Sequence, residues 1–228
     1  MMRFAAELRG GGCGERIFRF MNASYLIGLA VKIFLLLTPF FVLSVFVSTC
    51  SDMDHAARKN LALRTGLAVL IASVVFYLLG DAIFECLGIS LNAFRIGAGL
   101  VLMLNGIDMV RSSLPKNRQV DLGGDSAIVP LAIPTTVGPG TIGTLLVMGA
   151  NGAERAAQAG VSPLFFKGVE VGVIALAGCG VGIILYFSDG VSRLLKENGV
   201  KILSKLTGMY IVALAAQIIF DGVAGFLR

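Results

Sequence analysis

The chain has 228 residues, of which 56% are hydrophobic and 14% are charged, with a mean hydropathy of +0.86 and a formal net charge of +5. Soluble domains carry about 25% charged residues, so this composition excludes a soluble domain and indicates an integral membrane protein. The positive charges are scattered among the flanks of apolar segments and form no basic stripe, so no nucleic-acid partner is expected.

Residues 1–20 precede the apolar part of the chain and carry four arginines among glycines. The apolar run that follows them is as long as a full membrane span, which argues against a cleavable signal peptide. We interpret this segment as a leader that is either poorly ordered or a misassigned start.

Six windows then approach the length of about 20 apolar residues that a spanning helix needs. They cover residues 25–49, 66–87, 93–110, 127–150, 164–187 and 202–227. Their apolar runs are continuous and lack the alternating pattern of barrel strands. The predicted fold is therefore all-α, a polytopic membrane protein with six transmembrane helices.

A polar connection at residues 111–126 divides these spans into two triplets, residues 21–110 and residues 127–228. If the halves are related, an odd number of spans in each half requires them to be inverted repeats. Pro39 in the first span and Pro134 in the fourth stand at corresponding places. We therefore expect broken first and fourth helices.

The stretch "PTTVGPG" interrupts the fourth span at residues 134–140. Proline removes a backbone donor and glycine loosens the helix, and the carbonyls freed in hydrocarbon need partners from protein or from a wet cavity. Half-helix N-termini attract carboxylates, and freed carbonyls accept from ammonium groups. The pattern thus predicts a site for a small zwitterion. The alternatives are a simple kink at Pro39 and threonines that bond back to their own helix.

Three blocks of the sequence resemble one known family. "VPLAIPTTVGPGTI" (residues 129–142), "LGISLNAFRIGAGLVL" (residues 87–102) and "LSKLTGMYIVALAAQIIFDGV" (residues 203–223) are similar to blocks of the MarC family of integral membrane proteins. The chain departs from the family's "NPxGxxP"-type motif in the first span. It keeps Pro39 but has Thr38, Phe41 and Ser44 at the Asn, Gly and second Pro positions.

This resemblance implies a six-helix inner-membrane protein with two inverted three-helix repeats. Some members, the SnatA-type proteins, transport small neutral amino acids such as glycine and alanine. Together with the broken helices, the resemblance gives the expected substrate-binding residues, which are Thr38, Pro39, Ser44, Pro134, Thr135, Thr136, Gly138, Pro139, Gly140, Thr141 and Gln217.

Polar side chains inside the other spans form a second set of candidates. Asp81 and Glu85 are expected to lie at the interface or to pair with Arg95, and a coupling-ion or proton site is the less favoured alternative. Asn105 serves either as polar glue between helices or as cavity lining. Lys32 is expected to extend toward the membrane surface, and Lys167 is expected to pair with Glu170 at three-residue spacing.

Ten lysines and arginines flank the first, third and fifth connections, against four on the opposite side when the leader is excluded. The positive-inside rule then places both termini outside. The four cysteines form no CxxC pair, and His55 falls in a polar stretch, so neither a metal site nor a disulfide framework is indicated. No motif for an enzyme or a cofactor is present.

Two classes of function remain. The first is a secondary transporter of a small zwitterion, with its site between the broken first and fourth helices and with coupling to protons or sodium. The second is a non-transporting membrane scaffold or sensor in which the broken segment only packs. Membrane lipid is the expected surrounding partner in both classes, and the sequence leaves a homo-oligomer open.

Overall fold

The computed structural model describes residues 23–50, 53–111 and 137–227. Regular structure in these ranges is entirely helical. The predicted leader and most of the polar connection at 111–126 lie outside the described residues. The helices are α3 (Ala23–Leu36), α4 (Pro39–Thr49), α5 (His55–Leu87), α6 (Leu91–Arg111), α8 (Pro139–Ala150), α9 (Gly152–Ala159), α10 (Pro163–Tyr186) and α11 (Ser188–Phe226).

Five segments of the described chain are long and apolar enough to cross a membrane: Leu26–Thr49, His55–Gly80, Leu91–Arg111, Pro163–Tyr186 and Asn198–Phe226. The predicted fourth span is described only from residue 137, and its helix α8 has 12 residues. At 1.5 Å per residue, α8 is about 18 Å long, well short of a bilayer core of about 30 Å. The described residues therefore supply five spans and one shorter apolar helix.

A connection separates the fifth and sixth spans as predicted, from Tyr186 to Asn198, but it is helical rather than a loop. Only Phe187 separates α10 from α11, and α11 is helical from Ser188 onward. A hydropathy window finds the part of a helix that crosses the membrane, whereas a polar helix end can continue beyond it. Ion pairs support that end here, because Arg58 of α5 donates to the carboxylate of Asp189. His55 begins α5 and is exposed, and its Nδ1 lies 3.3 Å from Asp189 Oδ2.

Local sequence signals set several helix ends. Gly88 closes α5 and Gly160 closes α9, each with a positive φ that glycine adopts without strain. Ser162 caps α10, where its hydroxyl accepts from the Phe165 amide at 3.4 Å and Pro163 occupies the first turn.

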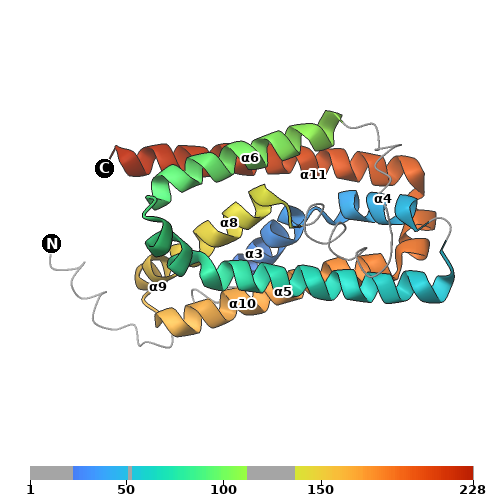
Figure 1. Cartoon of the computed structure of the whole chain (residues 1–228), viewed down its shortest axis with the longest axis horizontal. Helices are drawn as coiled ribbons and strands as arrows, with labels where there is room; N and C mark the ends of the chain where they lie inside the picture. Colours follow the sequence, from blue (N-terminus) through green and yellow to red (C-terminus); the bar gives the residue numbers. More distant parts are fainter. Residues whose placement is uncertain (1–22, 51–52, 112–136, 228) are drawn as a thin grey trace.

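The helices pack as two long pairs with the short helices between them. Figure 1 shows α6 beside α11 along one side of the molecule and α5 beside α10 along the other, with α3 and α8 in the middle. The main hydrophobic core joins α3, α4, α5 and α10, and a second core joins α6 to α11. The first half of the chain thus packs against the second half along most of its length.

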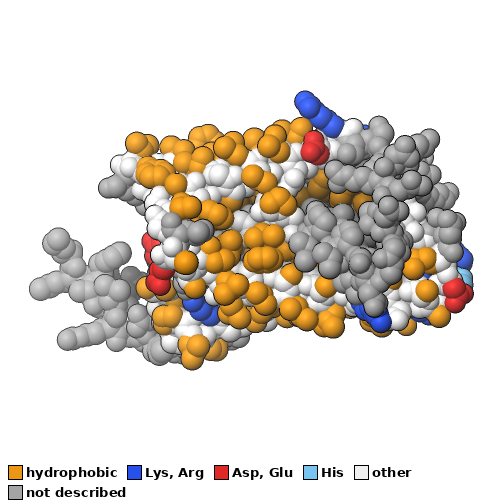
Figure 2. All heavy atoms as spheres, viewed as in Figure 1, with side chains coloured by type: hydrophobic (Ala, Val, Ile, Leu, Met, Phe, Trp, Pro, Cys, Tyr) orange, Lys and Arg blue, Asp and Glu red, His pale blue; other side chains and the backbone are white. Residues whose placement is uncertain are grey.

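The outer surface is apolar, as lipid requires. Among the described residues in Figure 2, hydrophobic side chains are spread over the middle of the visible face, and charged atoms lie toward its edges. On α5 the exposed hydrophobic residues recur about once per turn, which marks the side that faces the bilayer. They are Leu63, Leu67, Ile71, Val75 and Leu78.

Candidate functional site

The first span is interrupted between Leu36 and Pro39. Thr38 lies in the left-handed region, with φ 49° and ψ 50°. Among the described residues, it is the one non-glycine residue with a positive φ. A β-branched residue there stores strain, which persists only where the surroundings enforce it. The Thr38 side chain is 8% exposed, and its hydroxyl has no hydrogen-bond partner within the described chain.

The N-terminal turn of α8 lies against this interruption. Gly138 precedes α8 in extended conformation and Pro139 opens the helix. The Thr141 hydroxyl donates to the carbonyl oxygen of Leu36 at 3.3 Å, so the first turn of α8 supplies a donor to a carbonyl at the interruption of the first span. The Thr144 hydroxyl instead bonds back to the Gly140 carbonyl of its own helix at 2.9 Å.

Gly140 is a close-packing residue rather than an open wall of a site. A Cβ at this position would lie 2.7 Å from the α-carbon of Leu102 in α6. A larger residue would therefore push α8 away from α6, and we do not assign the space around Gly140 to a ligand.

A mixed polar cavity of about 460 Å³ begins about one helical turn from Thr141. It lies at the end of the molecule where α3 and α6 begin and α11 ends. Its wall carries both signs of charge on four different helices, together with amide, hydroxyl and apolar groups. The lining residues are Lys32, Arg95, Thr144, Val147, Met148, Asn151, Glu154, Arg155, Ile218 and Asp221.

Two arginines hold the C-terminal end of α8, whose last carbonyls have no partners inside the helix. Arg155 of α9 donates to the Met148 carbonyl at 2.5 Å. Arg95 of α6 donates to Asn151 Oδ1 at 2.7 Å, and the Asn151 amide donates to the Val147 carbonyl at 3.0 Å. Arg95 also donates to Asn92. Both guanidinium groups border the cavity.

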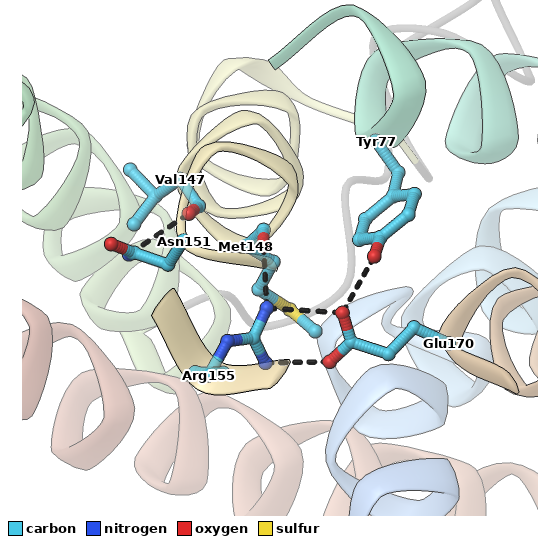
Figure 3. Close-up of polar contacts among 6 residues, drawn as sticks. All are labelled: Tyr77, Val147, Met148, Asn151, Arg155 and Glu170. Carbon is cyan, nitrogen blue, oxygen red and sulfur yellow. Dashed lines mark hydrogen bonds and ion pairs between the residues drawn. The ribbon is translucent and has the colours of Figure 1, made fainter. Parts of the chain in front are cut away.

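A buried carboxylate stands behind Arg155, as Figure 3 shows. Glu170 of α10 is 1% exposed. Its Oε1 accepts from Arg155 Nη1 at 2.5 Å, and its Oε2 accepts from Arg155 Nη2 at 3.1 Å and from the Tyr77 hydroxyl at 2.6 Å. The sequence spacing predicts a pair between Lys167 and Glu170, whereas the structure shows an ion pair between Arg155 and Glu170.

The predicted substrate-binding residues separate into groups. Thr38 and Pro39 lie at the interruption of the first span, and Gly138, Pro139, Gly140 and Thr141 lie at the start of α8, which the Thr141–Leu36 hydrogen bond links to that interruption. Ser44 is half-buried in α4, and Gln217 is exposed on α11 and does not line the cavity. Pro134, Thr135 and Thr136 lie outside the described residues.

The second predicted set is also dispersed. Arg95 lines the cavity, Asn105 is half-buried in α6, Glu85 is exposed near the end of α5, and Asp81 belongs to α5.

Several residues of the site were not identified from the sequence. Lys32, expected to extend toward the membrane surface, lines the cavity instead. Asn151, Arg155 and Asp221 also line it, although the sequence analysis gave them no role there. An ionisable residue inside an apolar span is the signal that could have marked Lys32 and Glu170. Arg155 belongs to the polar helix α9, and the contacts of α9 with the end of α8 bring it to the cavity.

Comparison with known proteins gives a single family. The model of the MarC family integral membrane proteins matches residues 23–227. The UPF0056 membrane protein YhcE of Escherichia coli K12 is 27% identical over 202 residues, 86% of this chain and 90% of that protein. The UPF0056 membrane protein MJ1677 of Methanocaldococcus jannaschii is 29% identical over 91% of this chain and 100% of that protein.

A third relative, the UPF0056 inner membrane protein YhgN of Escherichia coli K12, is 29% identical over 89% of this chain and 98% of that protein. No solved structure matches the chain.

Proposed function

The chain belongs to the MarC family of integral membrane proteins, and on this premise we propose that it is a secondary transporter of small neutral amino acids in the inner membrane. The substrate site lies in the polar cavity and extends to the junction of α3, α4 and α8. The inner-membrane location agrees with that of the relative YhgN, an inner membrane protein.

One observation carries this proposal, namely the charge pattern of the cavity. Lys32, Arg95 and Arg155 supply cationic groups, and Glu154 and Asp221 supply carboxylates, around a space of about 460 Å³. Small-ligand sites span about 300–1,000 Å³, so a small amino acid with some water fits this cavity. A zwitterion matches both signs of charge at once, whereas an apolar solute would leave them unpaired.

The packing of the two halves supports an inverted repeat. The second helix of each half, α5 and α10, forms one pair, and the third helix of each half, α6 and α11, forms the other. In the second pair, a Cβ at Gly106 would lie 2.9 Å from the Gly208 carbonyl oxygen, and a Cβ at Gly208 would lie 2.9 Å from the Gly106 carbonyl oxygen. Such a reciprocal contact is what a two-fold axis between repeats produces.

The positive-inside rule gives the direction in which the cavity faces. The cavity lies at the end where α11 terminates, and the loop charges favour an outside position for that end. In this orientation the structure corresponds to an outward-facing state.

Proteoliposomes test the proposal. Purified protein, reconstituted with unlabelled glycine or alanine inside, should accumulate labelled substrate from outside by counterflow, whereas protein-free vesicles should not. Unlabelled arginine and leucine serve as competitors that should displace little of the uptake. A scaffold or sensor would show no counterflow, and that result would refute the transporter proposal.

A further inference from the structure

Glu170 is an ionisable group buried inside a membrane span. It stands in the second turn of α10, 1% exposed, and both carboxylate oxygens are bonded to Arg155. A buried carboxylate is tolerated in such a place only while it is paired or protonated. Its state therefore depends on what its partner does.

Arg155 connects the buried carboxylate to the polar cavity. Its Nη1 and Nη2 donate to Glu170 and to the Met148 carbonyl, its Nε is buried without a partner among the described residues, and the residue also lines the cavity with its side chain 28% exposed. A guanidinium matches a carboxylate of a ligand as well as it matches a carboxylate of the protein. A substrate carboxylate in the cavity and the Glu170 carboxylate can thus compete for the same donors.

We propose that Glu170 carries the coupling proton of transport, because a substrate carboxylate that engages Arg155 removes the counter-charge of Glu170. This proposal rests on the function proposed above. A hydronium ion in the cavity transfers its proton to Glu170 Oε1 as Arg155 turns toward the substrate, which leaves a water molecule, and the neutral acid remains bonded to the Tyr77 hydroxyl. When substrate leaves on the other side, Arg155 returns, and Glu170 releases the proton there.

The other charged groups around this pair are compatible with an exchange of Arg155 between Glu170 and a substrate carboxylate. Tyr77 comes from α5, and beyond Arg155 the cavity holds Lys32 from α3, Glu154 from α9 and Asp221 from α11. On α10 itself, Lys167 lies three residues before Glu170. The sequence of α4, Pro39–Thr49, contains no ionisable side chain. Arg155 is thus the cation bonded to both oxygens of Glu170.

Wild-type proteoliposomes loaded with a pH-sensitive dye provide the first measurement. With the membrane potential clamped by potassium and valinomycin, an inward glycine gradient should acidify the interior as labelled glycine enters. Entry of labelled glycine without acidification would overturn the proton proposal and leave the transporter proposal intact. Absence of both would refute the transporter proposal instead.

Glu170→Gln provides the second measurement, since glutamine mimics the protonated acid and still accepts from Tyr77. This variant should retain glycine counterflow but show at least a tenfold loss of glycine-driven acidification. Glu85→Gln is the matched control, because Glu85 is exposed near the end of α5 and outside the cavity lining. Acidification at the wild-type rate by Glu170→Gln, or its loss in Glu85→Gln, would contradict the proposal.

Tyr77→Phe keeps the test decisive if Glu170→Gln does not fold. It removes one donor to the carboxylate and keeps the ion pair, so it favours protonation of Glu170. The midpoint of the pH dependence of glycine uptake should rise by about one pH unit. An unchanged midpoint would show that Glu170 only holds the helices together.

Discussion

Gly106 of α6 and Gly208 of α11 pack backbone against backbone, each presenting its carbonyl oxygen to the other residue's α-carbon. We expect Gly106→Ala to lower stability by about 1–3 kcal/mol, because the added methyl group overpacks this contact. Gly97→Ala on the same helix is the control, since a Cβ there meets nothing within 4 Å. Thermal unfolding in detergent should give a lower melting temperature for Gly106→Ala than for Gly97→Ala. Equal melting temperatures would contradict the packing role.

The hydrogen bond from Thr141 to Leu36 predicts a cost for breaking the link between the start of α8 and the interruption of the first span. Thr141→Val should lower the free energy of unfolding by about 1–2 kcal/mol, because it leaves the Leu36 carbonyl without this donor. Thr144→Val removes a bond within a single helix and should cost less than about 0.5 kcal/mol. A larger loss of stability in Thr144→Val than in Thr141→Val, measured by thermal shift, would contradict the role given to the Thr141–Leu36 hydrogen bond.

The Arg155–Glu170 pair predicts a strong dependence of folding on both partners. Arg155→Met leaves a buried carboxylate uncompensated and should destabilise the protein by about 3 kcal/mol, visible as low monodisperse yield. The double variant Arg155→Met/Glu170→Met should recover most of that yield, because it buries no charge. It should nevertheless transport no glycine, since the guanidinium is missing. A double variant as unstable as the single one would show that the pair is not the source of the loss.

The cysteines should differ sharply in reactivity. Cys50 is fully buried, and burial raises the pKa of its thiol to about 11, whereas Cys86 and Cys179 are exposed. A raised pKa keeps the group as a thiol, and the thiolate is the reactive form. In a Cys13→Ser/Cys179→Ser chain at pH 7.5, N-ethylmaleimide should modify Cys86 within minutes and Cys50 only after denaturation. Rapid modification of native Cys50, detected by mass spectrometry, would contradict the burial.

The loop charges predict the membrane orientation. A C-terminal alkaline phosphatase fusion should be active and a C-terminal green fluorescent protein fusion dark, since the positive-inside rule places this terminus outside. A cysteine introduced at Ser192, in the polar start of α11, should react only with a membrane-permeant reagent in intact cells. A fluorescent C-terminal fusion would reverse the orientation and make the cavity face the cytoplasm.

The sequence alone determined the class of fold and the place of the interruption in the first span. Apolar windows locate membrane helices because hydrocarbon tolerates only internally bonded backbone. Proline and glycine act locally, so Pro39 predicted non-helical backbone beside the left-handed Thr38, and Pro139 stands at the start of α8. The sequence could not predict where α11 begins, because a polar helix end resembles a loop in hydropathy.

The tertiary structure alone decided which polar groups share a cavity. Lys32, Arg155 and Asp221 are far apart in the chain, and the sequence around each one indicates only a charge near a membrane interface. The packing of α3, α9 and α11 brings them together. Helix packing also places Glu170 within hydrogen-bond distance of Arg155 and Tyr77. Gly140 stands within the predicted motif, yet its contact with Leu102 makes it a packing residue. Spacing along one helix predicts neighbours on that helix, whereas contacts between helices depend on which faces the fold buries.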